Sequence, residues 1–110
     1  MPKCKVVILT PALNDIHCIA DNHLMRVGPK SSEKITNNIL DRIIMLEEHP
    51  LAGSDHYDPV LHKQNYRKLV CGNYICVYKL IGESVYIYRV VHGATDYPNR
   101  FKWLIIKFYI

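Results

Sequence analysis

The sequence lacks any long hydrophobic run. Its N-terminal segment MPKCKVVILT contains an apolar stretch of only about five residues, which is too short for the hydrophobic region of a signal peptide. No segment approaches the roughly 18 consecutive apolar residues that suggest a membrane-spanning helix. We therefore expect a cytoplasmic protein without a membrane partner.

The sequence also lacks the motifs of most catalytic and cofactor sites. It has no glycine-rich phosphate loop, and no serine or cysteine lies in a nucleophile-elbow context. Its six histidines show no metal-type pairing, and its acidic residues are scattered, which argues against a paired-carboxylate hydrolase. We expect no metal and no cofactor.

Cysteine is present but shows no C-x-x-C spacing. The four cysteines are Cys4, Cys18, Cys71 and Cys76. Because we find no export signal, reduced thiols are the simplest interpretation.

The overall composition is that of an ordinary globular domain. The chain has 110 residues, of which 49% are hydrophobic and 22% charged, so we expect one domain over residues 1–110. A net charge of +4 favours acidic partners but is too small for a nucleic-acid-binding arm.

The N-terminal half predicts one strand and two helices. Residues 4–9 are β-branched and apolar, which is typical of a strand. Thr10 as N-cap and Pro11 in the first turn predict a helix that a Gly-Pro step ends. Either Ser31 or Ser32 can cap a second amphipathic helix. The short connection makes the two helices an antiparallel hairpin.

The C-terminal half changes to a period of two. Residues 49–63 are rich in turn-forming residues and predict an irregular crossing loop. Three strands and two-residue turns then form a β-meander, with the strands at 66–71, 74–80 and 85–92.

The turns also predict a register. The expected cross-strand pairs are Leu69–Cys76, Cys76–Arg89, Tyr78–Ile87 and Cys71–Tyr74. Since Cys71 faces Tyr74, this register argues against a disulfide between Cys71 and Cys76. Arg89 is expected to tie the sheet to a helix carboxylate such as Asp15 or Asp41.

Cationic and aromatic side chains gather on or beside the meander. They are Lys63, Tyr66, Arg67, Lys68, Tyr74, Lys79, Tyr86, Arg89, His92, Tyr97 and Arg100. Composition alone favours basic side chains that extend along the sheet toward solvent. The alternative is a surface for an acidic partner, either polynucleotide or protein.

Two motifs carry a family resemblance. The segments YRKLVCGNYICVY and VYIYRVVHGATDYP, at this spacing and after a D-P-x-L loop, resemble the ParE/RelE superfamily of type II toxins, often labelled plasmid-stabilisation proteins. The resemblance runs from Lys5 to Phe101. It implies an α+β fold in which a mostly antiparallel sheet packs on the helical hairpin. It also implies a cognate antitoxin that wraps and blocks the toxin and whose other half binds operator DNA.

The superfamily divides by mechanism. RelE-type members cleave mRNA on the ribosome with basic residues and usually a C-terminal tyrosine. Two positions that carry arginine in RelE-type members correspond here to Ile75 and to a position near Thr95, so both arginines are missing. Each missing donor costs such a site roughly 3 kcal/mol of transition-state stabilisation. The H-G-x-x-D-Y ending looks more like the ParE branch, whose members poison DNA gyrase.

The resemblance leaves three hypotheses. A gyrase-poisoning toxin leads, followed by a ribosome-dependent mRNA endonuclease and by an inactive, antitoxin-binding family member. The endonuclease would use Arg67, Lys68, Tyr97 and Arg100.

Individual residues receive the following expected roles. The partner-binding set is Lys63, Arg67, Lys68, Lys79, His92, Thr95 and Tyr97. The structural set is Gly72, Asn73, Tyr74, Arg89, Gly93 and Asp96, where Gly93 permits the turn after the last strand and Asp96 caps or pairs locally. The apolar, β-prone tail 101–110 is expected to pack as a strand or helix, because exposure would favour aggregation.

Overall fold

The computed structural model describes residues 3–93. Its elements, in chain order, are β1 (Lys5–Ile8), α1 (Thr10–Arg26), α2 (Pro29–Met45), β2 (Ser54–Asp55), α3 (Pro59–Lys63), β3 (Arg67–Cys71), β4 (Tyr74–Ile81) and β5 (Ser84–His92). The tail 101–110 and its expected packing lie outside the described residues. Within those residues, no helix combines the length and apolarity needed to cross a bilayer.

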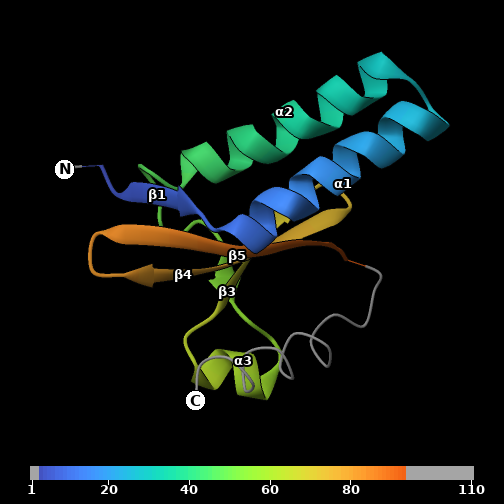
Figure 1. The fold of residues 1–110 in the computed structure, drawn as a ribbon. Helices are drawn as coiled ribbons and strands as arrows, with labels where there is room; N and C mark the ends of the chain where they lie inside the picture. Colours follow the sequence, from blue (N-terminus) through green and yellow to red (C-terminus); the bar gives the residue numbers. More distant parts are fainter. Residues whose placement is uncertain (1–2, 94–110) are drawn as a thin grey trace.

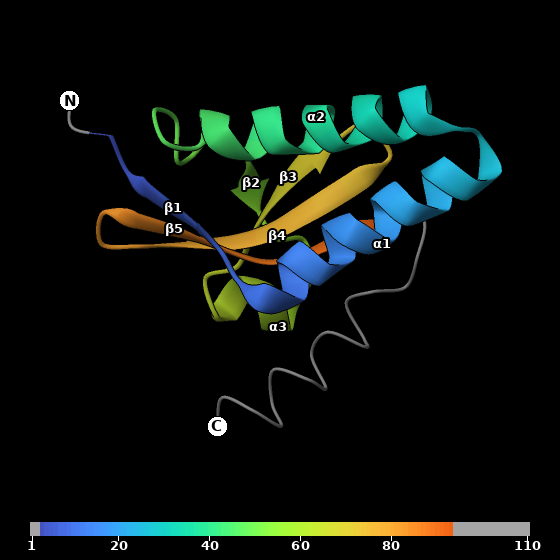
Figure 2. The ribbon, with the colours of Figure 1, turned by 45° about the horizontal axis from the view of Figure 1, so that its top comes forward.

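The elements form an α+β fold, as expected. One sheet has the strand order β1-β5-β4-β3-β2, in which β1 is parallel to β5 and the other neighbours are antiparallel. The hairpin of α1 and α2 covers one face of this sheet, and α3 lies on the other (Figures 1 and 2). The meander and the helical hairpin are therefore confirmed.

Both helices begin earlier than predicted. Thr10 is the first residue of α1 and does not cap it; Leu9 takes the N-cap position without a side-chain hydrogen bond. The reason is that the backbone N–H of Leu9 still donates to Ile87 O at 3.0 Å, so the chain passes from strand pairing directly into the helix.

The serines expected to cap α2 instead connect it to α1. The helix starts at Pro29, after Gly28 with φ 137°, a conformation that only glycine adopts readily. Ser32 Oγ donates to Ala20 O at 2.7 Å, and Ser31 Oγ lies 3.0 Å from His23 Nδ1. The predicted serine cap is thus wrong.

The crossing segment is more ordered than predicted. It contains the short edge strand β2 and the helix α3, capped by Asp58, whose Oδ1 accepts from the N–H groups of Val60 and Leu61 at 3.0 and 3.2 Å. Gly53 is required here, because a Cβ would lie 2.3 Å from Lys68 O. The D-P-x-L sequence therefore encodes a capped helix.

Most of the core lies between the hairpin and the sheet. Its buried residues are Ala12, Ile16, Ile19, Ile39, Ile43, Leu46, Leu69, Cys71, Cys76, Tyr78, Val85, Ile87 and Val90. The buried face of α1 ends before the end of the helix, since Leu24 and the following Val27 are 48% and 72% exposed. Figure 2 gives the reason: this end of the hairpin projects beyond the sheet.

The predicted register is confirmed between β3 and β4 and is wrong in part between β4 and β5. Leu69 pairs with Cys76 and Tyr78 with Ile87, but Cys76 pairs with Val90 and not with Arg89. A bulge shifts the register between Val77 and Tyr78. Because one extra residue reverses the alternation that follows, Val90 is buried beneath the helices.

The two predicted tight turns are present. Gly72 and Gly82 have φ values of 63° and 62°, and neither following residue has a positive φ, the pattern of a type II′ hairpin turn. Gly93 lies in the turn after β5, with a φ outside the left-handed region.

Candidate functional site

Tyrosines and lysines form a cluster on the sheet face that carries α3. We call it the tyrosine–lysine cluster; its members are Tyr57, Tyr66, Lys68, Lys79 and Tyr88. The side chains come from β3, β4, β5 and the segments before α3 and β3. Alternation along the strands places them opposite the face covered by the helical hairpin.

The cluster is built by cation–π contacts. Lys79 Nζ lies 4.2 Å from the ring centroid of Tyr66 and 5.7 Å from that of Tyr88, and the two rings meet edge to face at 5.1 Å. Lys68 Nζ lies 5.2 Å from the ring of Tyr57. Burial lowers the pKa of Lys79 from its usual 10.5. The ammonium groups are thus held against aromatic faces at the edge of solvent.

A buried histidine supports this surface from below. His56 is 2% exposed, accepts the N–H of Asp58 on Nδ1 at 3.0 Å and stacks on Tyr57 at 4.7 Å between centroids. Burial lowers the pKa of His56, Asp58 opposes that effect, and Lys68 adds to it. A neutral ring agrees with the acceptor role of Nδ1.

Arg67 does not join the cluster, although it is next to Lys68 in the chain. Its guanidinium donates to Asp55 Oδ1 at 2.7 Å, Gly53 O at 2.9 Å, Leu51 O at 3.3 Å and the hydroxyl of Tyr78 at 3.3 Å. Four of its five N–H donors are therefore engaged, on the hairpin side of the sheet. The structure brings Lys68 and Lys79 to one surface and separates Arg67 from them.

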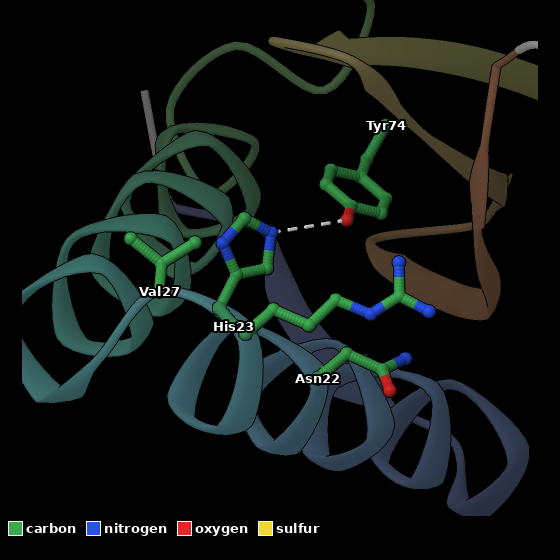
Figure 3. Close-up of a pocket in the computed structure, with 5 residues that line it drawn as sticks. Asn22, His23, Val27 and Tyr74 are labelled. Atoms are coloured by element: carbon green, nitrogen blue, oxygen red, sulfur yellow. Dashed lines mark hydrogen bonds between the residues drawn. The ribbon is translucent and has the colours of Figure 1, made fainter.

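A second polar group lies at the far end of the sheet. Figure 3 shows His23 of α1 pointing toward Tyr74 of β4, with 3.3 Å between Nε2 and the hydroxyl oxygen. Tyr74 also meets His92 edge to face at 5.4 Å. Asn22, Arg26 and Val27 complete a pocket of about 270 Å³. Sequence reasoning missed His23, because no local motif links it to Tyr74.

Arg89 makes the contact with Asp15 that the sequence suggested. Its Nε and Nη2 donate to the two carboxylate oxygens at 2.7 and 3.0 Å, and the N–H of Val90 donates to Oδ2 at 2.9 Å. The hydrogen bond to Asp15 raises the pKa of Arg89, so the guanidinium stays charged. This bidentate pair joins β5 to α1.

The family follows from the sequence profile that the chain matches. Residues 6–97 match the family described as ParE toxin of type II toxin-antitoxin system, parDE. The chain belongs to the ParE toxin family.

Solved structures share the fold of this ParE-family chain. A chain from the chromosomal ParDE system of P. aeruginosa gives a TM-score of 0.69 at 18% identity and covers 82% of this chain and 96% of its own. A chain of the RelBE2 toxin–antitoxin complex from Mycobacterium tuberculosis gives 0.61 at 20% identity and covers 82% and 98%. No curated protein matches with comparable significance.

The remaining expected site residues of this ParE-family chain are dispersed. Lys63 is exposed at the end of α3, His92 is exposed beside Tyr74, and Asn73 follows Gly72 in the first turn. Thr95, Asp96, Tyr97 and Arg100 lie outside the described residues. Within residues 3–93, no three His, Cys, Asp or Glu side chains are grouped closely enough to hold a metal ion.

Proposed function

We propose that this chain is the toxin of a type II toxin–antitoxin pair and that it acts in the cytoplasm by binding and poisoning DNA gyrase. The observation that carries the choice of mechanism is the position of Arg67. Its guanidinium is occupied by two backbone carbonyls, a carboxylate and a tyrosine hydroxyl. A group held in this way stabilises the fold and has little capacity left to bind a phosphate.

The positions of the lysines support the same choice. An RNA-cleaving site needs several donors aimed at one phosphate, where charge develops in the transition state. Lys68 lies over Tyr57, Lys79 lies over Tyr66, and Arg67 lies across the sheet from both. Among the described residues, Arg67 therefore does not converge with the two lysines on one phosphate, whereas a cationic and aromatic surface suits an acidic protein partner.

An antitoxin is the second partner that we propose. Both solved relatives come from toxin–antitoxin systems by their descriptions, and the net charge of +4 fits an acidic antitoxin. The pair would contact operator DNA through the antitoxin. A small acidic open reading frame beside the gene is the first thing to look for.

The decisive experiment uses the full chain purified away from its antitoxin. It is added to gyrase with relaxed or supercoiled plasmid, and we expect cleaved plasmid or blocked supercoiling that the antitoxin reverses. No effect at a large excess of toxin would overturn the gyrase proposal.

The same preparation separates the two alternatives. Cleavage of ribosome-bound mRNA would favour the endonuclease alternative, whose expected residues are Arg67, Lys68, Tyr97 and Arg100. A chain that binds its antitoxin but inhibits neither target and does not slow growth would be an inactive family member.

A further inference from the structure

Two buried thiols touch across the β3–β4 hairpin. Cys71 and Cys76 are both reduced, and their Sγ atoms lie 3.2 Å apart. Cys71 pairs with Tyr74 and Cys76 with Leu69, so the two cysteines are diagonal neighbours. The predicted register was correct for these pairs, but diagonal side chains of one face can still meet. An S–S bond of about 2.05 Å requires the sulfur atoms to approach by only about 1 Å.

Within the described part of the chain, Cys71 is the sulfur of the pair that is placed to meet a small reagent. Cys71 lines a cavity of about 320 Å³ between α2 and the first turn, together with Ile35, Asn38, Asp41, Arg42 and Gly72. Cys76 is fully buried behind it in the main core. A molecule the size of hydrogen peroxide, little larger than a water of about 30 Å³, fits this cavity.

The surroundings also assign different roles to the sulfurs. The hydrogen bond between the two thiols lowers the pKa of Cys71, and the nearby Arg42 lowers it further, against the effect of burial. The same bond and burial raise the pKa of Cys76. Arg42 is held beside the pair because its Nε donates to Val70 O at 3.3 Å. A thiolate is the reactive form of cysteine, so Cys71 is assigned as the nucleophile and Cys76 as the thiol that closes the disulfide.

We propose that Cys71 and Cys76 are a peroxide-oxidisable pair that closes to a disulfide in the folded chain. The Cys71 thiolate attacks one oxygen of hydrogen peroxide and breaks the O–O bond, which yields a sulfenic acid and hydroxide. Cys76 Sγ then attacks Cys71 Sγ, the S–O bond breaks, and the oxygen leaves as water with the Cys76 proton. In total, two thiols lose two electrons and two protons, and the peroxide becomes two waters.

The test uses the full chain, folded and reduced, with hydrogen peroxide as the probe. After oxidation the chain is alkylated in denaturant and digested with trypsin, which leaves both cysteines on one peptide from Leu69 to Lys79. We expect this peptide to lose two hydrogen atoms and to resist alkylation. Cys18, exposed on α1, reports the dose of peroxide. Full alkylation of Cys71 and Cys76 at doses that oxidise Cys18 would overturn the proposal.

The folded geometry is tested by repeating the reaction in urea. Held in contact, the pair should close faster than in the unfolded chain by on the order of tenfold. Equal rates, or random linkage to Cys4 and Cys18, would show that the fold does not prepare the pair.

Two matched variants test the assigned order, with far-UV circular dichroism as the check of folding. Cys76→Ser should leave a sulfenic acid at Cys71 that dimedone traps, and Cys71→Ser should leave Cys76 unmodified. Equal trapping in both variants would overturn the assignment of Cys71 as nucleophile. If either variant fails to fold, the comparison of folded and urea-unfolded wild type decides.

Discussion

The two faces of the sheet are made by the same strands but differ in what covers them. The face beneath α1 and α2 is closed by aliphatic side chains and crossed by the ion pair of Arg89 with Asp15. Among residues 3–93, the face that carries α3 has a smaller buried core of Leu61, Tyr66 and Val77, flanked by the other members of the tyrosine–lysine cluster. Most of the buried core of the described residues therefore lies on the first face, and we expect the second to be the more suitable for recognition.

Neighbouring residues of one strand can take these separate roles because strand side chains alternate. Arg67 donates a hydrogen bond to Gly53 O on the sheet face covered by α1 and α2. Lys68, the next residue, lies over Tyr57 on the other face. The bulge in β5 is an exception to this alternation. Two successive residues there contact the helix side: Arg89 pairs with Asp15, and Val90 packs in the core. Four variants, each with a matched control, test this division.

The largest effect is expected in the core beneath the hairpin. Ile43→Ala removes a fully buried side chain of α2 and should lower the free energy of unfolding by about 3 kcal/mol. Ile44→Ala, one residue further on the same helix, removes a side chain that is 54% exposed and should change it by less than about 0.5 kcal/mol. Urea denaturation of both variants gives the difference. Similar losses would mean that α2 does not pack as described.

The ion pair is the next test of the hairpin face. Asp15→Asn leaves the charge of Arg89 without its counter-ion and should cost about 2 kcal/mol, less than a fully buried pair because both side chains retain some solvent contact. Asp21→Asn makes the same change at an exposed position of α1 and is expected to be near neutral. Thermal unfolding at neutral pH measures both. An Asp15 variant as stable as wild type would make this contact dispensable.

Recognition is tested on the opposite face. Lys68→Gln with Lys79→Gln should weaken binding to gyrase roughly tenfold, about 1.4 kcal/mol, if the tyrosine–lysine cluster contacts the target. Lys30→Gln with Lys34→Gln removes the same charge from exposed positions of α2 and is the control. Affinity measured at two salt concentrations separates specific contact from long-range attraction. Equal losses in the two double variants would assign the effect to net charge alone.

The element types could be predicted from the sequence because period and turn chemistry are local. The change from a helical to an alternating pattern gave the hairpin and the meander, and Gly72 and Gly82 marked both tight turns. Helix starts were less predictable, although Thr10 and Ser32 are residue types that cap helices well. Leu9 donates to Ile87 O of β5, and the Ser32 hydroxyl donates to Ala20 O of α1, so neither helix starts at the expected cap.

The site was harder to predict, because its contacts join distant segments. An alternating sequence gives no sign of the bulge at Tyr88. The bulge shifts the register of β5, so that Val90 faces the helices. Lys68 and Lys79 were expected partner-binding residues, but the rings beneath them depend on how α3 and its flanking segments fold back. Arg67 looked equally available in the sequence, but three of its four acceptors come from a loop predicted to be irregular, and the fourth is the hydroxyl of Tyr78 on β4.

The smallest effect is a pH dependence centred on His56, which supports the α3 face from below. Because burial lowers the pKa of His56 below 6.5, the unfolded chain binds its proton at a higher pH than the folded chain does. The stabilisation is complete above pH 6.5 and is lost as the pH falls through the folded pKa. In His56→Asn, whose side-chain oxygen can accept the Asp58 N–H, the free energy of unfolding should fall less between neutral and mildly acidic pH. The control, His17→Asn on the exposed side of α1, should retain the wild-type slope. Parallel slopes in all three proteins would show that α3 does not depend on a neutral imidazole.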